Sequence, residues 1–93
     1  MKTPEGHVKD AVKDYLNHLG AYHFWPVQTG YGAATVDCLA CYKGRYIAIE
    51  TKRPGKPQPT ARQRITLTKV HVAGGIAIVA TCVEDVSKVL EKL

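Results

Sequence analysis

Three ionisable side chains near the middle of the chain, those of Asp37, Glu50 and Lys52, have the types and spacing that phosphodiester chemistry needs. Two carboxylates side by side repel each other unless a cation compensates them. Mg²⁺ is such a cation, because it binds through one or two carboxylates and keeps several waters. A lysine alongside can orient or deprotonate the attacking water, or neutralise charge on the phosphorane. These residues therefore indicate metal-assisted hydrolysis of a phosphodiester.

A tight β-hairpin is expected to position these residues. Segments 35–42 and 45–52 are predicted strands, and only Lys43 and Gly44 separate them. Glycine in a two-residue turn supplies the positive φ that such a turn requires. The two segments are therefore predicted to pair in antiparallel fashion, with the residues next to the turn facing each other.

This register brings the ionisable side chains together. Asp37 lies opposite Glu50, and facing Cβ atoms in an antiparallel pair are roughly 4.5 to 5.5 Å apart. The strand period of two puts Lys52 on the same face as Glu50, diagonal to Asp37. Spacing alone also permits a salt-bridged, solvent-facing strand in which Glu50 pairs with Lys52 and Arg53.

Length, charge and hydropathy limit the class of protein. The 93 residues are enough for one domain, residues 1–93, with a single core. Thirteen Lys and Arg against eight Asp and Glu give a formal charge of +5, which favours a polyanionic partner such as nucleic acid. No run resembles a signal peptide or a membrane span, so we expect a soluble cytoplasmic protein without a membrane partner.

Three cysteines, Cys38, Cys41 and Cys82, form no paired framework, which suits a reducing compartment. Cys38 and Cys41 spell C-x-x-C, but residues three apart on a strand point to opposite faces. Small buried hydrophobic residues are the favoured interpretation. A metal- or redox-sensing module built on this pair is the alternative.

The order of predicted elements is α, β, β, β, α, β, α, in an α/β fold. A right-handed crossover through the second helix would make the fourth strand parallel to the third, giving a mixed sheet flanked by helices. The last helix is expected to start with a Thr81–Glu84 capping pair. The predicted elements are a helix over 4–19, strands over 21–27, 35–42 and 45–52, a helix from Thr60 to Gly74, a strand over 76–80 and a C-terminal helix.

Two side chains on the helices are candidates to support the site. Glu5 begins the apolar stripe of the first helix, where it either favours the helix dipole or points inward at the site. Gln63 follows Thr60 with capping-box spacing, so it either caps the second helix or steers a water. The glycine-bearing loop 28–34 could approach a phosphate or simply turn.

Basic residues around these elements are candidate phosphate contacts, although solvated charge on a helix explains any one of them equally well. A stiff Pro-rich segment, 53–59, follows the third strand and is expected to line a groove. The candidate DNA-binding residues are Lys43, Arg53, Lys56, Arg62, Arg64 and Lys69.

Taken together, the helix with Glu5, then Asp37, then Glu50-Thr51-Lys52 and the helix with Gln63 resemble the VRR-NUC family of the PD-(D/E)XK nuclease superfamily. The similarity extends over nearly the whole chain. It implies a restriction-endonuclease-like αβββαβ core. It also implies that Asp37, Glu50 and the main-chain carbonyl of Thr51 bind the metal, that Lys52 is catalytic, and that Glu5 and Gln63 support the site.

The resemblance further implies DNA hydrolysis with Mg²⁺ or Mn²⁺. Small stand-alone members of the family occur in phages and bacteria, are similar to Holliday-junction-cleaving nucleases and tend to be homodimers, so the expected setting is a bacterial or phage-infected cell. Val36 stands before Asp37, where the superfamily name expects proline.

The leading hypothesis is therefore a metal-dependent, structure-selective DNA endonuclease, with four-way junctions as possible substrates and a homodimer as the expected assembly. The alternative is a non-catalytic nucleic-acid-binding module that retains the nuclease fold.

Overall fold

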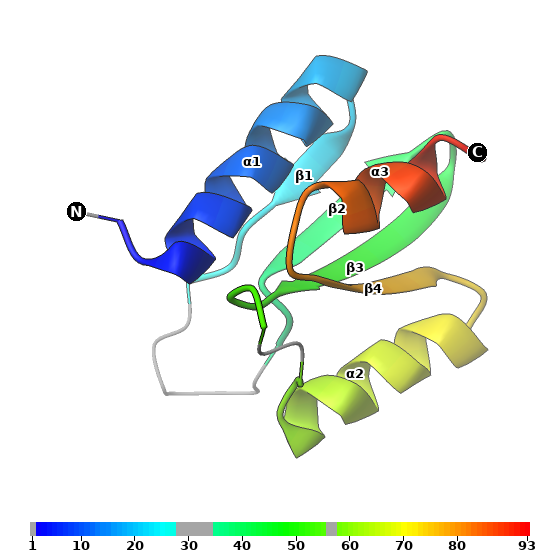
Figure 1. The fold of residues 1–93 in the computed structure, drawn as a ribbon. Helices are drawn as coiled ribbons and strands as arrows, with labels where there is room; N and C mark the ends of the chain where they lie inside the picture. The colour runs from blue at the N-terminus through cyan, green and yellow to red at the C-terminus, as the bar shows by residue number, and fades with distance from the viewer. Residues whose placement is uncertain (1, 28–34, 56–57) are drawn as a thin grey trace.

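The computed structural model describes residues 2–27, 35–55 and 58–93, and in this part of the chain three helices flank a four-stranded sheet (Figure 1). The strand order is β1-β2-β3-β4. The order of elements is the predicted one, and the mixed α/β architecture is confirmed. The elements are α1 (Pro4–Leu19), β1 (Tyr22–Phe24), β2 (Cys38–Tyr42), β3 (Arg45–Thr51), α2 (Ala61–Val72), β4 (Ile76–Ala80) and α3 (Glu84–Leu90).

Helix α1 has the predicted bounds, 4–19. The Thr3 hydroxyl accepts a hydrogen bond from the Gly6 N–H at 3.0 Å, and Pro4 occupies the first turn, where no N–H is needed. Gly20 ends the helix with φ 73°, a left-handed conformation that glycine adopts without strain. No helix in the described ranges combines the length and the apolar character that crossing a membrane requires.

The β2–β3 hairpin has the predicted register. Lys43 and Gly44 both have positive φ, 50° and 76°, as a two-residue hairpin turn needs. Tyr42 pairs with Arg45, and the ladder continues to the pair formed by Cys38 and Ile49. Asp37 lies one residue beyond the last pair, in a bend, so the next position across the ladder is Glu50.

The crossover through α2 makes β4 parallel to β3, as predicted. Ile47 pairs with Ile76 at one end of this ladder, and Thr51 pairs with Ala80 at the other. The Lys52 N–H then donates to the Ala80 carbonyl at 2.9 Å, so the parallel contact holds the chain just beyond β3.

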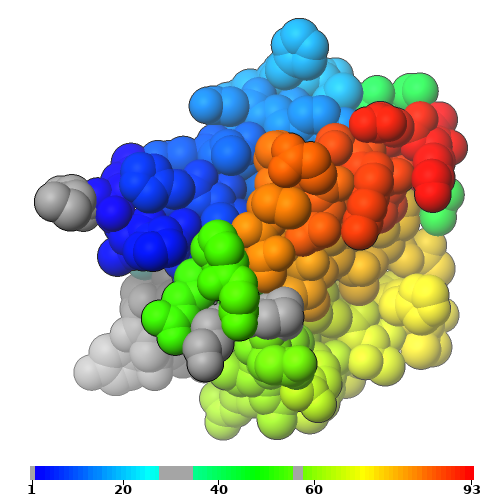
Figure 2. Space-filling view, viewed as in Figure 1, coloured from blue at the N-terminus to red at the C-terminus, as the bar shows by residue number. Residues whose placement is uncertain are grey.

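The two faces of the sheet are covered differently. Helices α1 and α3 lie on one face and α2 on the other (Figure 1). In space-filling view, α1 and α3 form a continuous surface, and the chain just after β3 emerges between α1 and α2 (Figure 2). The larger core, on the α1 and α3 face, includes Val12, Leu16, Ile47, Ile49, Val86 and Leu90, and the smaller one consists of Val36, Ala48 and Leu67.

Three details of the predicted elements are wrong. Strand β2 begins at Cys38 rather than at residue 35, because the chain bends at Asp37 before the pairing with β3 starts. Strand β1 is only three residues long, Tyr22–Phe24, rather than 21–27, because pairing with β2 stops where Pro26 approaches. Helix α3 has no Thr81–Glu84 capping pair. Its cap residue is Val83, without a side-chain cap, and the carboxylate that binds Thr81 belongs to Asp85.

Candidate active site

Asp37 lies just before β2, and Thr51, at the end of β3, holds its carboxylate. One oxygen, Oδ2, accepts hydrogen bonds from the Thr51 N–H at 3.0 Å and from the Thr51 hydroxyl at 2.7 Å. Thr51 is fully buried, so both donors are fixed in direction. The other oxygen of Asp37, Oδ1, faces the Lys9 ammonium group at 3.6 Å.

Glu50 is held in a complementary way. Its side chain is only 2% exposed, and its Oε1 accepts a hydrogen bond from the Asp37 N–H at 3.0 Å. Its Oε2 lies 3.2 Å from the Lys52 Nζ. Each carboxylate therefore binds the backbone of the hairpin through one oxygen and presents the other to a cation.

Burial and the neighbouring charge change the acidity of Glu50. Desolvation raises the pKa of its carboxyl group, and the Asp37 carboxylate raises it further, whereas Lys52 and the Asp37 N–H lower it by less. A buried carboxylate beside a second carboxylate favours any species that brings positive charge. This is the electrostatic condition for binding a cation.

A lysine that the sequence did not single out completes the cluster. Lys9, on α1, places its Nζ 3.6 Å from Asp37 Oδ1 and 3.8 Å from Glu5 Oε2. Glu5 therefore lies both in the first turn of α1, where it favours the helix dipole, and next to the site. Its link to Asp37 runs through Lys9.

Gln63 lies at the start of α2 and forms the predicted capping box with Thr60. Its Oε1 accepts a hydrogen bond from the Thr60 N–H at 2.8 Å, and the Thr60 hydroxyl accepts one from the Gln63 N–H at 3.2 Å. The capping interpretation is thus confirmed. A contact with the catalytic water stays a prediction.

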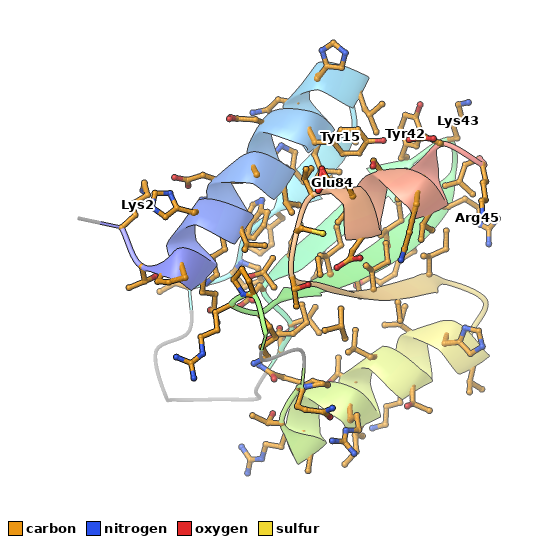
Figure 3. The ribbon with its side chains drawn as sticks, in the orientation of Figure 1. Lys2, Tyr15, Tyr42, Lys43, Arg45 and Glu84 are labelled. Atoms are coloured by element: carbon orange, nitrogen blue, oxygen red, sulfur yellow. The ribbon has the colours of Figure 1, made fainter. Side chains whose placement is uncertain are left out.

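The basic candidates fall into separate places. Lys43 is at the hairpin turn, at the opposite end of β2 and β3 from Asp37, where its Nζ donates to the Leu93 carbonyl at 3.3 Å. Figure 3 shows Lys43 and Arg45 beside the C-terminus, far across the molecule from Lys2. Lys56 and the loop 28–34 lie outside the described residues. The other candidates are exposed and lie on α2 or in the segment before it: Arg53, Arg62, Arg64 and Lys69.

The C-x-x-C pair behaves as two separate residues. Cys38 is fully buried in the larger core, whereas Cys41, three residues further along β2, is exposed. Burial, the largest cause, raises the pKa of the Cys38 thiol to about 12, so the residue stays protonated and unreactive. The expectation that the two side chains point to opposite faces is confirmed.

The donor chemistry of the Asp37 and Glu50 cluster fits a hard divalent cation. Carboxylate oxygens are the ligands that Mg²⁺ and Mn²⁺ prefer, and Mg²⁺ needs only one or two of them. The described part of the chain contains no group of three His, Cys, Asp or Glu residues arranged to hold a metal, so waters or a phosphate would complete the coordination. The Thr51 carbonyl stays a predicted ligand.

Sequence reasoning missed two contributors. The Thr51 hydroxyl was not expected to bind Asp37, because strand alternation puts Thr51 and Glu50 on opposite faces. The bend at Asp37 takes that residue out of the regular alternation. Lys9 follows Glu5 at i,i+4 spacing, which signals their ion pair, but nothing local to α1 signals Asp37.

Comparisons with known proteins bear on the fold. No protein-family model matches the sequence, and no curated protein matches it significantly. A solved structure described as "VRR_NUC domain" is similar to this one with a TM-score of 0.79, over 97% of this chain and 97% of that chain, at 23% sequence identity. The fold expected from the resemblance is therefore confirmed: this chain has the fold of a VRR_NUC domain.

Proposed function

We propose that this chain is a nuclease of the VRR-NUC family, which uses a divalent cation to hydrolyse phosphodiester bonds in DNA. The observation that carries the proposal is the paired arrangement of Asp37 and Glu50. One oxygen of each carboxylate accepts a hydrogen bond from a backbone N–H of the hairpin. The Lys52 Nζ lies 3.2 Å from the other oxygen of Glu50. The VRR_NUC-like fold supports the same conclusion.

In this proposal Asp37, Glu50 and the Thr51 carbonyl would hold Mg²⁺ or Mn²⁺. When bound, the ion polarises the phosphate and lowers the pKa of a coordinated water. Lys52 orients the attacking water and neutralises charge that develops on the phosphate oxygens. Thr51 keeps the Asp37 carboxylate in one orientation through the 2.7 Å and 3.0 Å hydrogen bonds.

DNA would reach these residues across the surface between α1 and α2. Helix α2 carries three exposed cations, Arg62, Arg64 and Lys69, and no Asp or Glu. Among the described residues, no carboxylate forms a salt bridge with any of the three. We further propose branched DNA, four-way junctions included, as substrate and a homodimer as the active assembly, since two sites related by a two-fold axis suit two symmetric nicks.

The test is cleavage of labelled four-way junction, fork, nicked, duplex and single-stranded DNA at one salt concentration. Each substrate is incubated with Mg²⁺, Mn²⁺ or EDTA. We expect metal-dependent cleavage by wild type and a loss of at least about 100-fold in Lys52→Ala.

Lys88→Ala is the matched control, because Lys88 also pairs with a carboxylate, that of Asp85, at 3.4 Å but lies outside the cluster. It should cleave like wild type. Full metal-dependent cleavage by Lys52→Ala would rule out the proposed role of that lysine.

The second candidate function is DNA binding without cleavage. The basic side chains of α2 favour it, because a basic helix surface binds the phosphate backbone regardless of catalysis. Tight, metal-independent binding by a folded protein that cleaves none of the substrates would establish this alternative.

A further inference from the structure

Lys9 lies beside the oxygen of Asp37 that Thr51 does not bind. Its Nζ lies 3.6 Å from Asp37 Oδ1, and Asp37 Oδ2 is already bound by two donors of Thr51. The Lys9 side chain is 35% exposed and that of Asp37 is 11% exposed. The Lys9–Asp37 ion pair is therefore less exposed to solvent than a surface ion pair, and dissolved salt weakens it less.

Lys9 also has a second anionic partner. Glu5, one helical turn earlier on α1, places its Oε2 3.8 Å from the same Nζ. An ammonium group is a compact charge on a flexible four-carbon stem, so it can move between two carboxylates without a change in the backbone. Lys52 has a different arrangement, because its one ion pair among the described residues is with Glu50.

We propose that Lys9 is a positioning residue that holds Asp37 Oδ1 in the metal-free protein, competes with a divalent cation for that oxygen, and is retained by Glu5 when the cation binds. This inference rests on the proposed metal-dependent function. A cation bound at Asp37 repels the ammonium group, and Glu5 gives the displaced charge a partner at i,i+4 spacing.

The charges of the cluster set the expected direction of the effect. Three carboxylates, from Asp37, Glu50 and Glu5, face only two ammonium groups, those of Lys9 and Lys52. Removing Lys9 leaves a more negative cluster and removes the competitor. Removing the charge of Glu5 leaves Lys9 with Asp37 as its remaining partner. The two substitutions should therefore change metal affinity in opposite directions.

The experiment is titration of Mn²⁺ into the DNA-free protein by calorimetry, with wild type, Lys9→Met and Glu5→Gln. Methionine keeps the length of the side chain and removes its charge. We expect Lys9→Met to bind Mn²⁺ about tenfold more tightly and Glu5→Gln to bind it several-fold more weakly. A role limited to packing or folding predicts weaker binding in both variants, so opposite signs exclude such a role.

The matched control is Lys88→Met. Lys88 pairs with Asp85, whose Oδ2 accepts both donors of a threonine just as Asp37 does, but Asp85 lies at the start of α3. This variant should keep wild-type Mn²⁺ affinity. Lys9→Arg, which retains the charge, should also stay near wild type, and thermal unfolding in EDTA checks that each variant is folded.

The outcomes separate this inference from the proposed function. If wild type binds Mn²⁺ and Lys9→Met matches Lys88→Met, the competition is absent and Lys9 has no positioning role, while the proposed nuclease stands. If wild type binds no Mn²⁺, with or without DNA, the metal-dependent function and the inference about Lys9 both fail.

Discussion

Asp37 and Asp85 are bound by the protein in nearly the same way, at two different places in the chain. In each residue Oδ2 accepts both donors of one threonine. Asp37 accepts from Thr51 N–H at 3.0 Å and its hydroxyl at 2.7 Å, and Asp85 accepts from Thr81 N–H at 2.9 Å and its hydroxyl at 3.2 Å. The other oxygen of each faces a lysine, at 3.6 Å and 3.4 Å.

The surroundings of the two aspartates differ. The lysine beside Asp85 is Lys88, on the same helix and 69% exposed, and the Thr81 N–H is the largest cause that lowers the pKa of the Asp85 carboxyl. Asp37 instead has the buried carboxylate of Glu50 next to it, whose pKa is raised. A threonine-bound aspartate with a lysine is thus a stabilising local motif, and a second buried carboxylate turns it into a candidate cation site.

The largest contrast is expected in catalysis. Asp37→Asn should lower kcat/KM for DNA cleavage by at least about 100-fold, because the amide removes a negative charge and a ligand from the site. Asp85→Asn should leave kcat/KM within about twofold of wild type. Rates measured on the same labelled substrate with saturating Mg²⁺ check both. Equal losses would mean that both aspartates act only through folding. A larger loss in Asp85→Asn would mean that the site has been assigned to the wrong aspartate.

The threonines should differ in their contribution to stability. Thr51→Val keeps the shape of a fully buried side chain but removes its 2.7 Å hydrogen bond to a carboxylate, so unfolding in urea should become easier by about 2 kcal/mol. Thr81→Val removes a longer bond, 3.2 Å, in a partly exposed position, and about 1 kcal/mol is expected. A larger loss from Thr81→Val would contradict the ranking by burial.

The dependence of stability on pH should have opposite signs at Glu50 and Asp85 when EDTA is present. Glu50 binds its proton more tightly in the folded state, so its contribution to stability falls as pH rises above the ordinary value of 4.5. Asp85, with a lowered pKa, adds stability above its ordinary value of 3.8 and loses it as pH falls towards the folded-state pKa.

Urea unfolding of wild type, Glu50→Gln and Asp85→Asn between about pH 3 and pH 7 separates the two carboxyl groups. Relative to wild type, Glu50→Gln should gain stability as pH rises and Asp85→Asn should lose it. Parallel curves for the two variants would contradict the opposite signs.

The smallest effect is expected at Gln63, whose side-chain oxygen accepts a hydrogen bond from the backbone N–H of Thr60. Gln63→Ala removes the bond from its Oε1 to the Thr60 N–H and should cost about 0.5 to 1 kcal/mol of stability. If Gln63 acts only as a cap, cleavage per folded molecule should stay within about twofold of wild type. A fall of more than about tenfold would reveal that Gln63 also acts on the water.

Rules that act over short stretches of sequence predicted most of the fold. The spacing of Val8, Val12 and Leu16 predicted α1, and the short turn at Lys43 and Gly44 predicted the register that puts Asp37 across from Glu50. These features depend on helix period, capping and turn geometry, which the chain specifies locally.

Contacts between elements escaped the same reasoning. The approach of Lys9 to Asp37 depends on how α1 packs over the sheet, and helical spacing does not determine that position. Thr81 binds Asp85 rather than Glu84, its neighbour in the sequence. The difference is a single position at the start of a helix, where sequence patterns locate the boundary least precisely. The part of the site within the hairpin was thus predictable, whereas the part that depends on packing between α1 and the sheet was not.

The turn between β2 and β3 makes the site depend on the length of the chain. Asp37 lies five residues before Tyr42 and Glu50 five residues after Arg45, so the turn acts as the origin from which both positions are counted. One inserted residue that shifts the pairing by one position reverses the face of every side chain on one strand. Through evolution, this turn should accept residues that tolerate positive φ but reject insertions and deletions, and a circular permutation opened there would remove the constraint that aligns the two carboxylates.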